Sequence, residues 1–181
     1  IPLRLVGSEM CIRDRWDKTI QAYHASVAFV DKQIGLFLEG LKKNPRGRNT
    51  YVMLVSDHGW HLGEKKHWCK GAIWEQTTHI PFIVSGPGIE AGTRCLQPAS
   101  LIDVYPSLVD LSGIEVPEWL DGKSVKPQLD NPDQARGPAI TSYGSGNTSV
   151  RTKRWRYILY EDGSEELYDH QIDPNAVSYT H

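Results

Sequence analysis

The chain has 181 residues, of which 39% are hydrophobic and 23% are charged, and its formal net charge is −2. These proportions are typical of a globular protein, and the small net charge excludes a strongly basic face for nucleic acid or anionic lipid. No apolar run in the sequence approaches the roughly 18–20 residues of a membrane span. The 3 cysteines stand at spacings that indicate neither a disulfide framework nor a zinc site.

The first predicted element is a long amphipathic helix. From Trp16 to about Lys43, apolar residues recur every three or four positions, which places them on one stripe of a helix. The sequence Asn44-Pro45-Arg46-Gly47 should end this helix, because proline cannot continue it and glycine permits a turn. We expect the helix to cover one face of a sheet.

The two ends of the chain differ in character from the rest. Residues 1–15 and 176–181 contain the runs VGSEMCIRDR and AVSYTH, which resemble translated sequencing-adapter read-through. We therefore expect both ends to be foreign to the native gene. The alternative is a natural arm at each end.

A polar loop between two apolar runs holds the candidate chemistry. The runs Tyr51–Val55 and Ile80–Val84 predict strands buried on both faces of a parallel or mixed α/β sheet. Asp57 and His58 follow the first strand, where open α/β sheets bind ligands, and Lys70 lies in the same loop. The alternative is a purely structural loop with an N-cap aspartate, a surface histidine and a solvated lysine.

Two other histidines of this loop, His61 and His67, are expected to be solvated. Ser100 to Asp103 has the pattern of a capping box, and the helix that it opens should continue to Ser112 and close at Gly113. Cys95, which precedes it, is expected to be a buried or partly buried free thiol.

The last third of the chain predicts a linker and a small antiparallel sheet. The segment between Ile114 and Pro138 is rich in Pro, Gly, Asp and Lys, which is typical of a surface linker. Alternating patterns with short turns then predict four strands. These are Ala139–Tyr143, Thr148–Thr152, Arg154–Tyr160 and Glu166–Tyr168. We expect one face of the third strand to pack and Arg154 or Arg156 to face outward.

Several motifs together resemble one known family. They are S-D-H-G-W-x-L-G-E from Ser56, H-W-x-K from His67, a strand between H-I-P and G-P-G, and a closing L-Y-D-H-x-x-D-P. This set resembles the second half of the sulfatase catalytic domain, closest to iduronate-2-sulfatase-like bacterial members, over roughly Trp16 to Pro174.

The resemblance implies an α/β fold, the C-terminal part of an alkaline-phosphatase-like sulfatase catalytic domain followed by a small antiparallel β subdomain. It places the catalytic part at residues 16–116, the linker at 117–138 and the subdomain at 139–175. Members are periplasmic, secreted or lysosomal, and they hydrolyse sulfate esters, here expected to be a sulfated carbohydrate or a small sulfate ester.

By the same resemblance, Asp57 and His58 match calcium ligands, and Lys70 matches a lysine that contacts the sulfate oxygens. His58 could instead donate a proton to the leaving group. Asn147, Thr148 and Arg151 precede or belong to the V-R-T sequence, near which family members carry substrate-selecting residues.

Other parts that the family uses are not in this sequence. The family's nucleophile is a formylglycine made in a C-x-P-S-R or S-x-P-S-R motif, which this sequence lacks, as it lacks the upstream Asp-Asp pair that completes the calcium shell. We therefore expect the isolated chain to bind calcium poorly and to turn over no substrate. The alternatives are a phosphate or phosphonate monoester hydrolase of the same superfamily and a non-catalytic pseudo-sulfatase.

Overall fold

The computed structural model describes residues 3–177, with side chains from Arg15 onward. Part of each end expected to be foreign therefore lies outside the described residues. The chain divides into two compact units. One contains the chain up to Thr50 and His61–Cys69, and the other contains Tyr51–Trp60 and the chain from Lys70 onward. Within residues 3–177, none of the helices is both long enough and apolar enough to cross a membrane.

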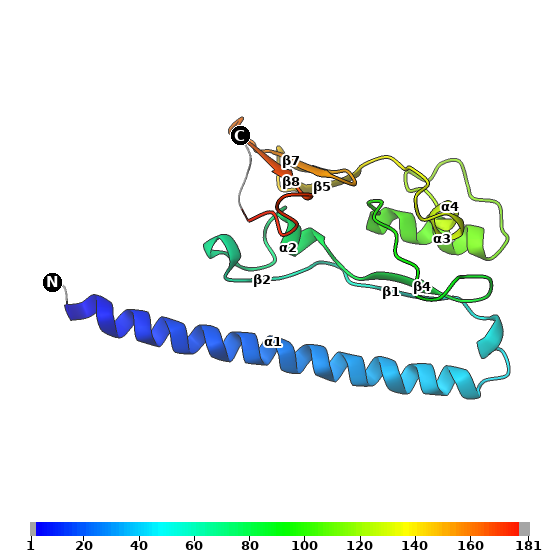
Figure 1. Ribbon diagram of the computed structural model, residues 1–181, viewed down its shortest axis with the longest axis horizontal. Coiled ribbons are helices and arrows are strands. Elements are labelled where there is room, and N and C mark those ends of the chain that lie inside the picture. Colours follow the sequence, from blue (N-terminus) through cyan, green and yellow to red (C-terminus); the bar gives the residue numbers. More distant parts are fainter. Residues whose placement is uncertain (1–2, 178–181) are drawn as a thin grey trace. The chain divides into compact units, whose positions relative to one another are not determined.

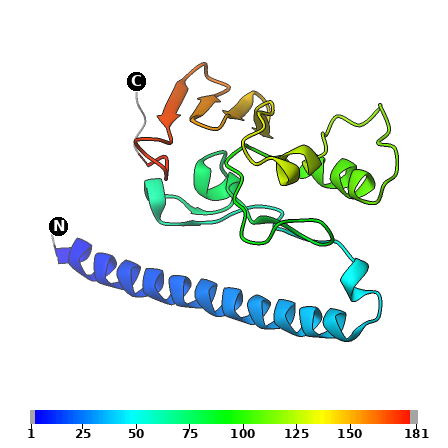
Figure 2. The ribbon, with the colours of Figure 1, turned by 45° about the vertical axis from the view of Figure 1, so that its right-hand side comes forward.

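Helix α1 (Leu3–Lys43) dominates the first unit and is drawn in blue in Figures 1 and 2. It begins earlier than the apolar pattern predicted, because no proline separates residues 3–15 from the predicted start. It ends where predicted, and Gly47 is essential there, because an added Cβ would lie 2.0 Å from the Leu41 carbonyl oxygen. A 3-10 turn (Gly47–Asn49) follows.

The other part of this unit is a two-stranded hairpin of β2 (His61–Leu62) and β3 (Trp68–Cys69), joined through a 3-10 turn at Glu64–Lys66. The Trp68 ring lies 5.3 Å from the Trp16 ring of α1 between centroids.

His61 is fully buried, so the prediction that it is solvated was wrong. Its imidazole packs edge-on against His67, with 4.9 Å between the ring centroids. Burial lowers the pKa of His61, and His67 adds to this shift, because an uncharged imidazole is easier to bury.

In the second unit, β1 (Val52–Val55) pairs antiparallel with β4 (Phe82–Ser85), with Val55 opposite Phe82. Both strands were predicted, but their burial on both faces was not confirmed. In β4 half-buried and exposed residues alternate, and Ile83 is 56% exposed. The reason is that among the described residues these two strands pair only with each other.

The predicted capping box is confirmed, with Ser100 and Asp103 bonding reciprocally at the start of a 3-10 turn (Leu101–Asp103). This turn leads into α3 (Val104–Leu111), and Gly113 closes it with a φ of 73°. Cys95 is exposed rather than buried or partly buried, because its loop lies on the surface and its thiol contacts only backbone there.

The predicted linker is more ordered than its composition indicated. It contains α4 (Lys126–Asp130), and Val125 is buried. The Ser107 hydroxyl accepts a hydrogen bond from the Val125 amide at 2.9 Å, and Asp103 pairs with Arg136 at 2.9 Å. These bonds fasten the segment to α3, although few of its side chains are apolar.

The C-terminal sheet is a four-stranded antiparallel meander in the order β5-β6-β7-β8, as predicted. The strands are Ala139–Tyr143, Asn147–Arg151, Trp155–Leu159 and Glu165–Asp169. Figure 2 shows them in succession, in yellow to red. The core of this part consists of Ile73, Ile158, Tyr168 and Ala176.

Candidate active site

The loop after β1 is held by backbone bonds rather than by a helix cap. The Gly59 and Trp60 amides donate to the carbonyls of Thr77 and Gln76 at 2.6 and 2.9 Å. A Cβ on Gly59 would lie 2.0 Å from the Gln76 carbonyl oxygen, so only glycine fits this close approach. The loop is thereby fixed in front of α2 (Glu75–Thr78), a single helical turn.

Asp57 and His58 converge at the start of this loop. His58 Nδ1 lies 2.8 Å from the Gly59 carbonyl oxygen, which can only accept, so Nδ1 carries the proton. His58 Nε2 is then left with a lone pair, and it lies 3.4 Å from Asp57 Oδ2. An imidazole nitrogen and a carboxylate oxygen therefore lie next to each other at the cavity.

Lys70 lies on the same cavity as Asp57 and His58. The cavity has a volume of about 1250 Å³ and draws its lining from the second unit alone. Within residues 15–177, the Lys70 ammonium forms no hydrogen bond or ion pair with another side chain. This unpaired cation is available to an anionic ligand.

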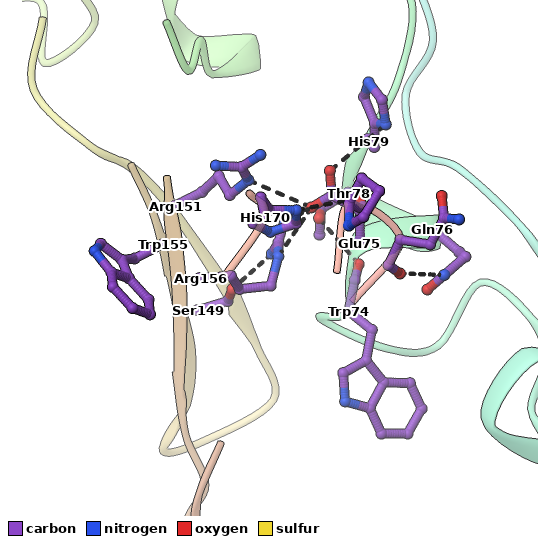
Figure 3. A network of polar contacts seen from close by, with 12 residues as sticks. Trp74, Glu75, Gln76, Thr78, His79, Ser149, Arg151, Trp155, Arg156 and His170 are labelled. Carbon is purple, nitrogen blue, oxygen red and sulfur yellow. Dashed lines mark hydrogen bonds and ion pairs between the residues drawn. The ribbon is translucent and has the colours of Figure 1, made fainter. Parts of the chain in front are cut away.

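Another part of the cavity lining is a buried polar network centred on Glu75, shown in Figure 3. Arg156 donates from Nε and Nη2 to Glu75 Oε2 at 3.0 and 2.5 Å. Arg151 Nε and His170 Nε2 lie 3.4 and 3.5 Å from the same oxygen. The network therefore joins α2 to three parts of the C-terminal sheet.

Of Arg154 and Arg156, one was expected to face outward, and the structure shows that it is Arg154, because Arg156 is buried, at 2% exposed. It shares the inner face of β7 with Ile158, and it also donates to the Ile73 carbonyl and the Ser149 hydroxyl at 3.1 and 2.7 Å. Arg154 is the more exposed arginine, and it pairs with Asp169.

Glu75 was not singled out from the sequence. Burial alone would raise its pKa, but the charges of Arg156 and Arg151 outweigh this effect and hold the pKa below its ordinary value. Burial lowers the pKa of His170, against the opposing charge of Glu75.

These shifts predict a loss of stability in acid. Glu75 and His170 each have a lower pKa in the folded than in the unfolded state. The unfolded state therefore binds more protons, and the free energy of unfolding decreases as the pH is lowered. The free energy of unfolding should fall first below the ordinary histidine pKa of 6.5, through His170 and His61, and again below the ordinary Glu75 value of 4.5. Urea unfolding between about pH 2.5 and 8 measures both falls.

The variant His170→Gln should weaken the first fall and leave the second in place. His24→Gln, which removes an exposed imidazole from α1, is the control. An unchanged pH slope in His170→Gln between about pH 5 and 6.5 would contradict the assignment.

The three candidate substrate residues lie in different places. Arg151 lines the cavity of Asp57, His58 and Lys70. Asn147 lies at the β5–β6 turn, where its amide donates to the Tyr143 and Ser145 carbonyls, and it lines a separate cavity of about 370 Å³. Thr148 lines neither cavity.

Among the described residues, no group of three His, Cys, Asp or Glu side chains forms a metal site. The carboxylate of Asp57 is an oxygen donor of the kind that calcium takes, roughly 6–8 to an ion. The imidazole of His58 is a nitrogen donor, which transition metals prefer, so Asp57 fits one position of a calcium shell better than His58 does.

Comparison with known proteins identifies the family. Residues 7–114 match the Sulfatase family, and residues 63–180 match the family described as N-sulphoglucosamine sulphohydrolase, C-terminal. A sulfatase of Formosa agariphila is 41% identical over 161 residues, which cover 88% of this chain and 32% of that protein. The chain spans about a third of the length of the curated relatives it matches.

Solved structures agree with this match. BT4656, solved with its substrate D-glucosamine-2-N,6-O-disulfate, is 30% identical with a TM-score of 0.71, covering 84% of this chain and 34% of its own. The phosphonate monoester hydrolase of Agrobacterium radiobacter is 25% identical with a TM-score of 0.70, covering 84% and 35%. The chain belongs to the sulfatase family, and its α/β fold is the C-terminal part of an alkaline-phosphatase-like sulfatase domain.

Proposed function

We propose that this chain is part of an enzyme that hydrolyses the sulfate esters of a sulfated carbohydrate. The observation that carries the proposal is that Asp57, His58 and Lys70 line one cavity, although Lys70 is separated from the other two along the chain. A sulfate ester is anionic, and further negative charge gathers on the leaving oxygen as the S–O bond breaks, so its site needs cations.

Asp57 and His58 would hold a calcium ion, with other ligands from the rest of the enzyme. When bound, calcium supplies positive charge next to the oxygens of the ester. His58 has only Nε2 available, because Nδ1 is bonded to the Gly59 carbonyl, so a metal-ligand role excludes proton donation by the same atom. The convergence with Asp57 favours the role of ligand.

Lys70 would bind the sulfate oxygens. Its ammonium is a compact charge with three donors, which suits a tetrahedral anion that presents oxygens in several directions. The likeness to BT4656, which was solved with D-glucosamine-2-N,6-O-disulfate, favours a sulfated carbohydrate over a small ester.

Assays on the complete enzyme and on the 181-residue chain test the proposal. The complete enzyme should release sulfate from D-glucosamine-2-N,6-O-disulfate, lose this activity with a calcium chelator and regain it with added calcium. The isolated chain should release none, because it lacks the nucleophile motif.

Three outcomes would contradict the proposal. Calcium-dependent sulfate release by the isolated chain would overturn the expected dependence on other parts of the enzyme. Faster turnover of a phosphonate monoester than of any sulfate ester would favour the alternative that the likeness to the Agrobacterium hydrolase raises. A complete enzyme that binds sulfated sugars without turnover would indicate a pseudo-sulfatase.

A further inference from the structure

The buried network has more positive than negative charge. Glu75 contributes one carboxylate, whereas Arg151 and Arg156 contribute two guanidinium groups that stay protonated at any physiological pH. The imidazoles of His79 and His170 also lie 3.5 Å from this carboxylate, and neither supplies negative charge. One positive charge in this wall of the cavity is therefore not balanced by Glu75.

The excess charge belongs to Arg151 rather than to Arg156. Arg156 is buried, and its donors are used by Glu75, Ile73 and Ser149. Arg151 is 23% exposed in its side chain, comes closest to Glu75 through Nε at 3.4 Å and donates from Nη1 to the Thr152 carbonyl.

A guanidinium has five N–H donors, and within residues 15–177 Arg151 Nη2 forms no hydrogen bond. Arg151 thus combines an uncompensated charge with spare donors in a half-buried place.

Other cationic side chains of the same cavity differ, because each pairs with its own carboxylate. These pairs are Arg136 with Asp103, Lys153 with Asp133 and Arg154 with Asp169. Among the described cations of the cavity wall, Lys70 and Arg151 remain without a full counter-charge. Lys70 comes from the loop segment and Arg151 from β6, so the cavity has two separate sources of free positive charge.

We propose that Arg151 forms a second anion subsite, which binds a carboxylate or a further sulfate of the substrate apart from the sulfate ester that is cleaved. The inference rests on the proposed function, because it assigns the cleaved sulfate to Lys70, Asp57 and His58. The planar fork of arginine matches the paired oxygens of either group. Glu75 is then a positioning residue, since it holds Arg151 by Nε and leaves Nη2 directed to a ligand.

The test is equilibrium binding and kinetics of the complete enzyme with matched substrates. The first pair is a sulfated uronic acid disaccharide and the same disaccharide with its carboxyl group reduced. The second pair is glucosamine that carries both an N-sulfate and an O-sulfate, compared with N-acetylglucosamine that carries the O-sulfate alone. Arg151→Gln should weaken binding and kcat/KM on the order of 10- to 100-fold for the member with the second anion. For the substrate of the pair that lacks the second anion, Arg151→Gln should change binding and kcat/KM by less than about 2-fold. The pair that shows the effect identifies the group as carboxylate or sulfate.

Lys153→Gln is the matched control, because it removes a charge from the same cavity that Asp133 already balances. Arg151→Lys keeps the charge without the fork, and it should retain a preference for the doubly anionic member even if Arg151→Gln folds poorly. Equal losses of binding and kcat/KM for both substrates of both pairs would overturn the subsite. Arg151 would then have a purely structural role. Arg151-dependent binding without sulfate release would support the subsite while contradicting the proposed function.

Discussion

Replacing Lys70 with alanine should lower kcat/KM of the complete enzyme roughly 10²–10³-fold, the loss seen when one preorganised donor to a developing anion is removed. The reason is that the Lys70 ammonium has no partner among the side chains of residues 15–177 and lies on the cavity of Asp57 and His58. Its charge is therefore available to the sulfate, and its removal breaks no structural bond. Steady-state kinetics and thermal unfolding of the same samples measure the two effects separately.

Lys126→Ala is the control for this prediction. Lys126 is also an exposed lysine, but it pairs with Asp130 within α4 and does not line the cavity. Its loss should leave kcat/KM within about 2-fold of the wild type. An unchanged kcat/KM in Lys70→Ala, or a fall explained entirely by a lower melting temperature, would remove Lys70 from the proposed site.

The elements that the sequence predicted well are those fixed by local patterns. The four C-terminal strands agree with the alternation and turns to within two residues at their ends. The end of α1 and the capping box at Ser100 depend on neighbours within a few positions, and both are confirmed. Local chemistry decides such features because each involves backbone groups only a few residues apart.

What the sequence could not predict depends on contacts between distant residues. Glu75 and Arg156 are 81 positions apart, and the sequence around neither residue predicts a buried ion pair. The alternation in β7 did place Arg156 and Ile158 on one face, and this was the available signal. The alternation could not decide which of Arg154 and Arg156 faces outward, because the burial of Arg156 depends on a partner from another element.

The residues of the candidate site likewise divide into those that local sequence predicted and those that only tertiary contacts bring together. Asp57 and His58 are adjacent, and their position after a strand was evident from the apolar run before them. Arg151 was a candidate substrate residue only through the family resemblance, as were Asn147 and Thr148. The structure does not bring Asn147 and Thr148 to the cavity that Arg151 lines. Pairing of β6 with β7 places Arg151 opposite Arg156, and this register, set by tertiary structure, joins Arg151 to the network.

Replacing Arg156 with methionine should destabilise the fold by about 3–5 kcal/mol, because it leaves the Glu75 carboxylate in a buried site without its main partner. Glu75 is 6% exposed, and Arg151 comes closest to it at 3.4 Å, whereas Arg156 donates two shorter bonds to it. Urea unfolding at neutral pH measures the change. Lys153→Met, which breaks an exposed pair with Asp133, is the control and should cost about 0–1 kcal/mol.

The double variant Glu75→Gln with Arg156→Met separates the worth of the pair from the cost of an orphaned charge. Once the carboxylate is also neutral, no buried charge lacks its main partner, so the double variant should be more stable than Arg156→Met alone. Additive losses would mean instead that the two residues stabilise the fold independently. Because the same carboxylate holds Arg151, Glu75→Gln should also reduce the preference for a doubly anionic substrate, linking the stability of the C-terminal sheet to recognition in the cavity.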